Sequence, residues 1–325
     1  METTVLTVKT TGSDAVIRSL KAEGVTTIFG YPGGAIMPIY DALFHHLEEV
    51  NHILVRHEQG AIHAAQGYAR SSGKTGVVFS TSGPGATNLI TGLADALIDS
   101  TPVVCITGQV ASHLLGTDAF QESDVMGITM PVTKWNCQVT KAKDIAPTLT
   151  KAFYIASSGR PGPVLVDITK DAQFEAIDFH YEKCNSVRSY QSKPKLKLEQ
   201  VQEAASLLNV AKKPLMLVGQ GVMLSSAENE LLTFAEKTGI PVASTLLGLG
   251  AFPANNPLFV GMVGMHGNFA PNVKTNECDV LLAIGMRFDD RVTGDVTRYA
   301  RQAKVIHIDI DAAEINKIIK VDAPI

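Results

Sequence analysis

The sequence has no segment that could cross a membrane as a helix. Its apolar runs are of strand length, well short of the ~18 residues that a membrane-spanning helix needs. The first residues lack a basic segment followed by a long apolar core, so we expect neither a secretory signal nor a transit peptide. The net charge is −4, and no basic stripe suggests nucleic acid or an anionic membrane as a partner.

Cysteine is also scarce. The four cysteines lie at positions 105, 137, 184 and 278, and no two of them have C-x-x-C spacing. His113 and His180 are not placed to complete a zinc site with them. We therefore expect four reduced thiols and no structural metal, which is typical of a cytoplasmic protein.

What the chain does have is 325 residues with 45% hydrophobic content, enough for two α/β domains. Strand and helix patterns alternate over residues 10–175, which predicts a doubly wound, mainly parallel sheet. The expected strands are 26–29, 52–56, 76–80, 102–107 and 163–168, and the expected helices are 12–23, 35–48, 58–71, 86–98 and 144–157.

A polar stretch interrupts this pattern at about 176–198. It is nearly free of apolar periodicity, and we interpret it as a linker between domain 1–175 and domain 199–325. The second domain repeats the alternation of helices and strands and should also hold a parallel sheet. Its expected helices are 199–210 and 226–238, and its expected strands are 214–218, 240–244, 279–284 and 304–310.

Three strand-to-helix junctions of the first domain carry polar or glycine-rich residues. They are Gly30–Ala35, Arg56–Glu58 and Thr81–Asn88. Glu58 alone would most simply be a first-turn carboxylate that stabilises its helix. Ligands of open α/β sheets bind at the carboxyl ends of strands, however, so three such junctions together predict one cleft.

Several motifs resemble the thiamine-diphosphate (thiamine pyrophosphate) enzymes, and in particular the acetolactate synthase (acetohydroxyacid synthase) large-subunit family. The resemblance runs from about residue 10 to the last residue. The motifs that carry it are Gly30-Tyr31-Pro32-Gly33-Gly34-Ala35, His57-Glu58-Gln59-Gly60-Ala61, Thr117-Asp118-Ala119-Phe120-Gln121-Glu122, Arg160-Pro161-Gly162-Pro163-Val164-Leu165-Val166-Asp167 and Arg287-Phe288-Asp289-Asp290-Arg291-Val292-Thr293-Gly294.

The resemblance implies a carboligase that decarboxylates pyruvate and joins the product to a second 2-ketoacid. Pyruvate as acceptor gives 2-acetolactate, and 2-ketobutyrate gives 2-aceto-2-hydroxybutyrate, in branched-chain amino-acid biosynthesis. The implied cofactors are thiamine diphosphate, a structural FAD in the second domain, and Mg²⁺. The implied partners are further copies of the chain, as a homodimer or tetramer, and a small regulatory subunit.

The resemblance also assigns roles to single residues. Glu58 would hydrogen-bond the ring nitrogen of the cofactor's aminopyrimidine. Gln121 would be the second catalytic residue and would face the substrate and the thiazolium ring. Substrate would contact Phe120, Lys170, Met265 and Arg291. Without the resemblance, Lys170 and Arg291 would be read as solvated surface residues. The implied cofactor-binding residues are Tyr31, Pro32, Gly33, Gly34, Glu58, Pro84 and Asn88 in the first domain and, for FAD, Arg160, Gly219, Gly221, Thr245, Leu246, His266, Gly285, Arg287, Asp289 and Asp309.

One feature departs from a complete enzyme of this family: the chain has no Gly-Asp-Gly motif for the metal-bound diphosphate. Separately, Gly219-Gln220-Gly221 is not a full dinucleotide-binding fingerprint, so the FAD site is expected from the resemblance and not from this spacing. We expect a third domain with the Mg²⁺ ligands to be missing, so residues 1–325 alone should be inactive. The alternatives are a pyruvate-oxidase-like flavin enzyme and a non-catalytic fragment that binds flavin or a partner.

Overall fold

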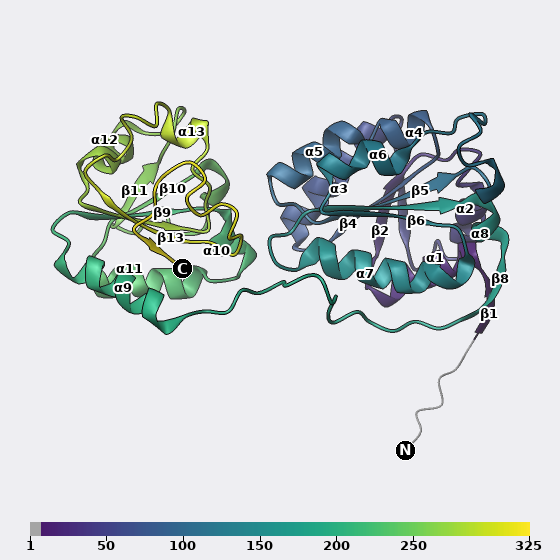
Figure 1. Ribbon diagram of the computed structural model, residues 1–325, viewed down its shortest axis with the longest axis horizontal. Helices are drawn as coiled ribbons and strands as arrows, with labels where there is room; N and C mark the ends of the chain where they lie inside the picture. Colours follow the sequence, from purple (N-terminus) through teal and green to yellow (C-terminus); the bar gives the residue numbers. More distant parts are fainter. Residues whose placement is uncertain (1–7) are drawn as a thin grey trace, which may run out of the picture. The chain divides into compact units, whose positions relative to one another are not determined.

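The computed structural model describes residues 8–325, which form two compact units (Figure 1). The first unit ends at Ser192 and the second begins at Lys193. Each contains a six-stranded sheet in which every strand pair is parallel. The predicted class, two parallel-sheet α/β domains, is thereby confirmed.

The first sheet has the strand order β3-β2-β4-β5-β7-β6. Its strands are β2 (Thr27–Gly30), β3 (Asn51–Leu54), β4 (Gly76–Ser80), β5 (Val103–Gln109), β6 (Trp135–Val139) and β7 (Pro163–Thr169). The helices are α1 (Gly12–Ala22), α2 (Met37–Phe44), α3 (Glu58–Ser72), α4 (Pro84–Thr87), α5 (Ile90–Ile98), α6 (Val125–Thr129), α7 (Ile145–Ser157) and α8 (Lys170–Phe174), with 3₁₀ turns at Ser112–Leu114, Met130–Val132 and Ala142–Asp144.

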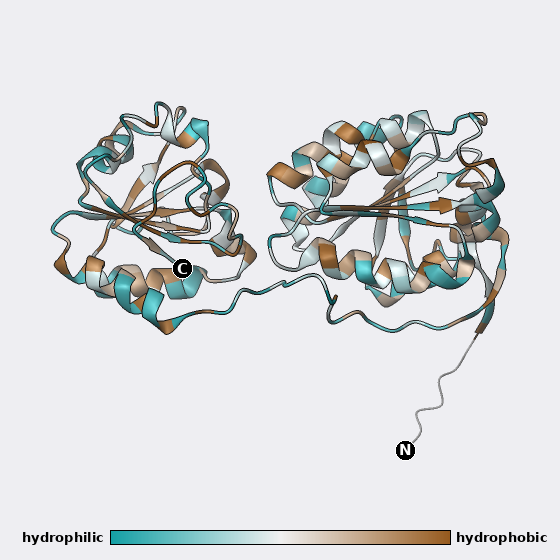
Figure 2. Ribbon diagram, in the orientation of Figure 1, coloured by the Kyte–Doolittle hydropathy of each residue, from teal (hydrophilic) through white to brown (hydrophobic). Residues whose placement is uncertain are grey.

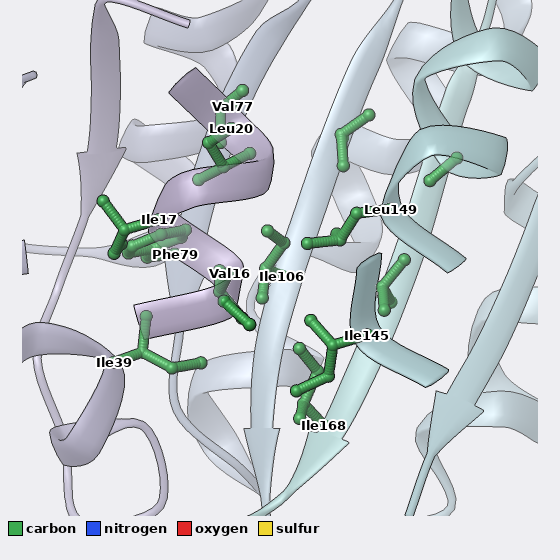
Figure 3. Packing of buried hydrophobic residues seen from close by; sticks show 14 of the residues in the cluster. Val16, Ile17, Leu20, Ile39, Val77, Phe79, Ile106, Ile145, Leu149 and Ile168 are labelled. Atoms are coloured by element: carbon green, nitrogen blue, oxygen red, sulfur yellow. The ribbon is translucent and has the colours of Figure 1, made fainter. Parts of the chain in front are cut away.

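Alternating strand residues explain why helices cover both faces of this sheet. In β4, Val77 and Phe79 belong to the core under α1 and α7, whereas Val78 belongs to the core under α3 and α5. Both sets are fully buried, as expected for a parallel sheet between two helical layers. Figure 3 shows the first of these cores, where α1 residues meet Phe79 and Ile106 of the strands.

Helix α3 begins and ends where its sequence specifies. His57 caps the amino end, because its Nδ1 accepts a hydrogen bond from the Gln59 backbone. Gly73 ends the helix in the left-handed conformation, with φ of 70°, which glycine adopts without steric cost. Glu58 is therefore fixed as the first helical residue.

The structure departs from the predicted elements of the first unit in three places. Strand β6 was not predicted, because its alternating polar residues give no apolar run. The helix expected over 86–98 is two helices, α4 and α5. Residues 176–179, which we assigned to the linker, form strand β8 (Ala176–Phe179), and β8 pairs antiparallel with β1 (Val8–Thr11).

The second sheet has the order β11-β10-β9-β12-β13-β14. Figure 2 shows its strands mostly in the hydrophobic colours, with hydrophilic residues on the outer turns of its helices. Its strands are β9 (Pro214–Val218), β10 (Val242–Ser244), β11 (Phe259–Met262), β12 (Val280–Ile284), β13 (Lys304–Ile308) and β14 (Ala323–Pro324). The helices are α9 (Leu198–Val210), α10 (Gln220–Leu224), α11 (Glu228–Thr238), α12 (Phe269–Glu277) and α13 (Asp290–Thr293), with a 3₁₀ turn at Leu246–Gly248.

Candidate functional site

The first sheet reverses its strand order beside β2. The chain passes from β2 to β3 on one side and then crosses to β4 on the other side. Such switch points leave a crevice at the carboxyl ends of the strands, where ligands of α/β proteins bind. The three junctions singled out in the sequence follow β2, β3 and β4, so the structure brings them to one edge.

Glu58 lies at this edge, and its side chain is largely removed from solvent. The residue is 7% exposed, which is unusual for a carboxylate without a cationic partner. Asn88 Nδ2 donates a hydrogen bond of 2.9 Å to Glu58 Oε2. Within residues 8–325 the other oxygen, Oε1, accepts no hydrogen bond, so a buried acceptor is left available to a ligand.

Backbone without side chains surrounds this carboxyl group. A Cβ on Gly85 would lie 3.4 Å from Glu58 Oε1 and 2.8 Å from Ser80 Oγ. A Cβ on Gly33 would lie 2.6 Å from the Thr81 side chain. Gly34 faces open space, and Tyr31, Pro32 and Pro84 are exposed beside these glycines. The edge therefore offers a glycine-lined surface next to one buried oxygen.

Tyr40 belongs to the same environment and was not predicted from the sequence. Burial raises the pKa of its hydroxyl above the usual value, and the charge of Glu58 raises it further. The hydroxyl lies 3.2 Å from His52 Nε2. No sequence signal identifies Tyr40, because it occupies an ordinary position in α2 and meets Glu58 only through the fold.

The segment 110–123 follows β5 and carries Phe120 and Gln121. Phe120 is 87% exposed, and Gln121 is exposed with a positive φ of 57°. A Cβ on Gly83 would lie 2.6 Å from the Gln121 backbone oxygen, so this segment packs directly on the turn after β4. Glu122 directly follows Gln121 and accepts hydrogen bonds from the backbone of Gly116 and of Ala119. These bonds close the segment into a compact turn.

Two other predicted residues of the first unit lie at opposite edges. Lys170 begins α8 directly after β7, at the carboxyl edge that holds Glu58. Arg160 precedes β7 and therefore lies at the amino edge. Its guanidinium donates 2.9 Å to Ser100 Oγ and 3.3 Å to the Ile98 carbonyl. Within the first unit, the structure thus separates Arg160 from the other predicted residues.

The second sheet has its own switch point, between β9 and β12. Gly219 follows β9 and Gly285 follows β12, and the two turns are in close contact. A Cβ on Gly221 would lie 2.6 Å from Gly285 Cα, and one on Gly219 would lie 2.3 Å from the Gly285 oxygen. Glycine is required here by backbone packing, and the result is a side-chain-free surface at the carboxyl edge.

The other predicted residues of the second unit follow neighbouring strands along the same edge. Thr245 begins the turn after β10, where its hydroxyl accepts a hydrogen bond from the Gly248 backbone. Met265 follows β11, and its backbone N–H donates 2.7 Å to the Arg291 carbonyl. Arg291 Nη1 lies 3.9 Å from Met265 Sδ. Leu246 and His266 are exposed in these same turns.

The two predicted aspartates of this unit already make structural hydrogen bonds. Asp289 caps α13, because its Oδ1 accepts hydrogen bonds from the backbone of Arg291 and Val292. Asp309 Oδ1 accepts a hydrogen bond of 2.8 Å from the Asp311 backbone. Arg287 lies 4.0 Å from Asp289 Oδ2. All ten FAD residues expected from the sequence, except Arg160, therefore lie along one edge of the second sheet.

A surface cavity of about 320 Å³ lies elsewhere in the first unit. It is lined at the amino end of β2 by residues that include Glu23, Thr26, Lys74 and Cys184. It is at the sheet edge opposite to Glu58 and shares no residue with the site described above. Residues 8–325 contain no group of three or more metal-ligating side chains. None of the helices in that range is long and apolar enough to span a bilayer.

Comparison with protein-family models gives two matches. Residues 10–128 match the N-terminal TPP binding domain of thiamine pyrophosphate enzymes, and residues 201–325 match the central domain of the same enzymes. The first match contains Glu58, Asn88 and Gln121. The second contains the glycine turns of β9 and β12.

Individual proteins are similar along nearly the whole chain. A probable acetolactate synthase large subunit of Methanocaldococcus jannaschii is 53% identical over 97% of this chain and 53% of its own length. Acetolactate synthase large subunits of Corynebacterium glutamicum and Haemophilus influenzae are 53% and 51% identical, over 97% and 98% of this chain and 50% and 56% of their own lengths. The chain thus spans about half the length of these relatives. It belongs to the thiamine pyrophosphate enzymes, of which it carries the N-terminal cofactor-binding domain and the central domain.

Proposed function

We propose that this chain is the N-terminal and central part of an acetolactate synthase large subunit. The observation that carries the proposal is the buried carboxyl group of Glu58, held by Asn88 at a switch point with one oxygen available. The similar proteins are named acetolactate synthase large subunits, and for this reason we propose acetolactate synthesis among the reactions of thiamine enzymes. The reaction is decarboxylation of pyruvate and addition of the product to pyruvate or 2-ketobutyrate.

The residues around Glu58 fit the aminopyrimidine half of thiamine diphosphate. When bound, that cofactor supplies a nucleophilic carbon that attacks a 2-ketoacid and accepts the electrons left by decarboxylation. Glu58 Oε1 would share a proton with the pyrimidine ring nitrogen, while Asn88 holds Oε2 in place. Gly33 and Gly85 would let the ring approach the backbone, because a side chain at either position has no room.

Substrate would meet residues of the same edge. Phe120 offers an exposed apolar ring, and Gln121 an amide that can donate to the oxygens of a 2-ketoacid. Lys170 would add a positive charge. In the second unit, we propose that Arg291 binds the carboxylate of the acceptor and that Met265, whose sulfur it contacts, lines the approach.

For FAD we propose the carboxyl edge of the second sheet as the binding surface. The glycine turns after β9 and β12 fit a cofactor that lies against backbone, and a diphosphate can be bound by backbone N–H groups. Thr245, Leu246, His266, Arg287, Asp289 and Asp309 flank these turns. Arg160 is proposed as an FAD-binding residue on the resemblance alone. FAD would be structural, since the net reaction transfers no electrons.

We propose that the Mg²⁺ ligands belong to the part of the relatives' length that the chain does not span. We further propose a homodimer or tetramer with a small regulatory subunit. The location proposed is the cytoplasm, and the four free cysteines are consistent with that reducing compartment.

The test is a product assay on the full-length protein with pyruvate, thiamine diphosphate and Mg²⁺. Acetolactate should form, and bound flavin should stay oxidised throughout turnover. Flavin that is reduced by pyruvate would favour the pyruvate-oxidase-like alternative. A flavoprotein that converts no 2-ketoacid under these conditions would overturn the enzymatic proposal.

A further inference from the structure

A buried carboxylate to which the proposed function gives no role lies inside the first sheet. Asp167 is near the carboxyl end of β7 (Pro163–Thr169) and is 0% exposed. Within residues 8–325 no lysine, arginine or histidine forms an ion pair with it. A buried charge without a counter-charge is costly unless hydrogen bonds satisfy it. Burial accordingly raises the pKa of Asp167, and neighbouring donors offset part of that rise.

Three uncharged side chains donate to this carboxylate from the two strands beside β7. The Thr107 hydroxyl donates 2.6 Å to Oδ1. Gln109 Nε2 and Gln138 Nε2 donate 3.1 Å and 3.0 Å to Oδ2. Thr107 and Gln109 belong to β5 and Gln138 belongs to β6, so Asp167 joins three adjacent strands near their carboxyl ends.

Gln109 connects this network to the segment 110–123. Its Nε2 also donates 3.2 Å to the Ser123 carbonyl, and its Oε1 accepts 2.9 Å from the Val110 backbone. One glutamine amide therefore contacts both ends of the segment that carries Phe120 and Gln121. Its orientation is fixed by Asp167, because the Nε2 must point at the carboxylate.

We propose that Asp167, acting through Gln109, is a positioning residue that holds the segment 110–123 in place for Phe120 and Gln121 to reach substrate. The anchoring stands on the hydrogen bonds alone, whereas its effect on substrate rests on the proposed function. The amino half of the segment is held separately, because the backbone N–H and the hydroxyl of Ser112 both donate hydrogen bonds to the Asp171 carboxylate. We call this pair of bonds the clasp between Ser112 and Asp171. The Asp167 network holds its carboxyl half, next to Gln121.

The decisive variant is Asp167→Leu. It keeps a side chain of similar length but removes both acceptor oxygens, so the Nε2 groups of Gln109 and Gln138 lose the acceptor that orients them. Gln138 can turn its amide over without affecting the segment. If Gln109 turns over, it loses its bond to Ser123. We therefore expect hydrogen exchange of backbone amides in 110–123 of the full-length protein to accelerate about tenfold, while β4 stays protected.

The matched control is Gln138→Met. It removes one donor from the same Asp167 oxygen but leaves both bonds of Gln109 intact. We expect it to lower the unfolding midpoint by less than Asp167→Leu does, and without accelerating exchange in 110–123. Unchanged exchange in Asp167→Leu, or equal acceleration in Gln138→Met, would overturn the proposal and leave the network a purely structural one.

Two further variants keep the test decisive if Asp167→Leu folds poorly. Gln109→Met leaves Asp167 two donors but removes the bond to Ser123, so exchange in 110–123 should again accelerate. Combining Gln109→Glu with Asp167→Asn rebuilds a bond between the two positions, but a carboxylate at 109 has no hydrogen to give to Ser123. The midpoint should then recover while exchange in 110–123 stays fast. Recovery of both would contradict the proposed path through Ser123.

Kinetics of the same variants separate this inference from the proposed function. In Asp167→Leu the KM for pyruvate should rise several-fold with a smaller change in kcat, and Gln138→Met should change neither. Fast exchange in 110–123 with an unchanged KM would support the anchoring by Asp167 but contradict the proposed contact of Phe120 and Gln121 with substrate.

Discussion

The carboxyl-end edges of the two sheets differ in what they bury. In the first unit two carboxylates are buried near this edge, Glu58 at the start of α3 and Asp167 in β7. In the second unit two glycine turns pack backbone against backbone, while the charged groups of Arg287, Asp289 and Arg291 stay partly or largely exposed. The same architecture thus presents a buried carboxylate at one edge and a glycine backbone surface at the other.

The difference indicates what each edge must keep rigid. In the role proposed for Glu58, an acid–base oxygen must stay in one place, and a hydrogen bond from Asn88 holds the carboxylate. In the role proposed for the second edge, a cofactor lies on two closely packed turns, and a Cβ on Gly219 or Gly221 would leave no room for that packing. Substitutions at the first edge should therefore change rate, and substitutions at the second edge should change stability and flavin content.

The largest effect expected is on turnover, from Glu58→Gln in the full-length protein. The amide cannot share a proton with the pyrimidine nitrogen in the same way, so kcat should fall by roughly 10²–10⁴-fold. The thermal midpoint and the flavin content should stay near those of the wild type. Near-normal turnover would contradict a role for Glu58 in the reaction and leave it only the role of stabilising the first turn of α3.

Gly221→Ala should produce the largest change of stability. Its Cβ would lie 2.6 Å from Gly285 Cα, so one of the two turns must move. We expect a loss of about 1–3 kcal/mol in the free energy of unfolding and a lower flavin content. Gly67→Ala in α3 is the matched control: its Cβ meets open space, and alanine is the better helix former. Equal effects of both substitutions on unfolding would show that the contact with Gly285 is not tight.

Arg291→Ala should change the choice of acceptor. Loss of the guanidinium removes a charge-assisted hydrogen bond to the carboxylate, and we expect the product ratio between 2-ketobutyrate and pyruvate to change several-fold. Products from mixed substrates measure this ratio, with Arg301→Ala as the control for loss of a surface charge. A product ratio equal to that of the control would leave Arg291 only its contacts with Asp290 and Met265.

The smallest effect expected is the pH dependence of the clasp between Ser112 and Asp171. Partial burial favours protonation of Asp171, but the hydrogen bonds from Ser112 outweigh it and lower the pKa from 3.8 to about 2. A depressed folded-state pKa stabilises the fold above pH ~4, and this contribution is lost as the pH falls toward 2. The midpoint difference between wild type and Asp171→Asn should shrink over that window. A difference that does not vary with pH would show that the clasp is not ionic.

The sequence predicted the site edge better than its internal geometry. Glu58 and the glycine turns could be placed because strand-to-helix junctions have local signals in composition and turn residues. That Glu58 pairs with Asn88 could not be predicted, because the partners are separated by 30 positions and meet through the sheet. Asn88 also lies at the break between α4 and α5, where the sequence predicted one continuous helix.

The network around Asp167 was missed for a related reason. Thr107, Gln109 and Asp167 lie in or directly after predicted strands whose pattern indicates an apolar core, and isolated polar residues there give no periodic signal. Gln138 lies in β6, which was not predicted. A search for isolated Asp, Gln and Thr in otherwise apolar strands would have found Thr107, Gln109 and Asp167. It would not have paired them, because pairing requires the strand order β5-β7-β6.

The antiparallel pair of β1 and β8 has a consequence for how the first unit can be cut and rejoined. Val8 lies opposite Phe179 and Thr11 lies opposite Ala176, so β1 lies beside β8, the last strand of the unit. A short connection there, with new ends opened in the exposed turn at Ser72–Lys74, would leave all parallel strand pairs of the sheet intact. The first unit should therefore tolerate circular permutation, because its fold does not depend on the order in which its segments follow one another along the chain.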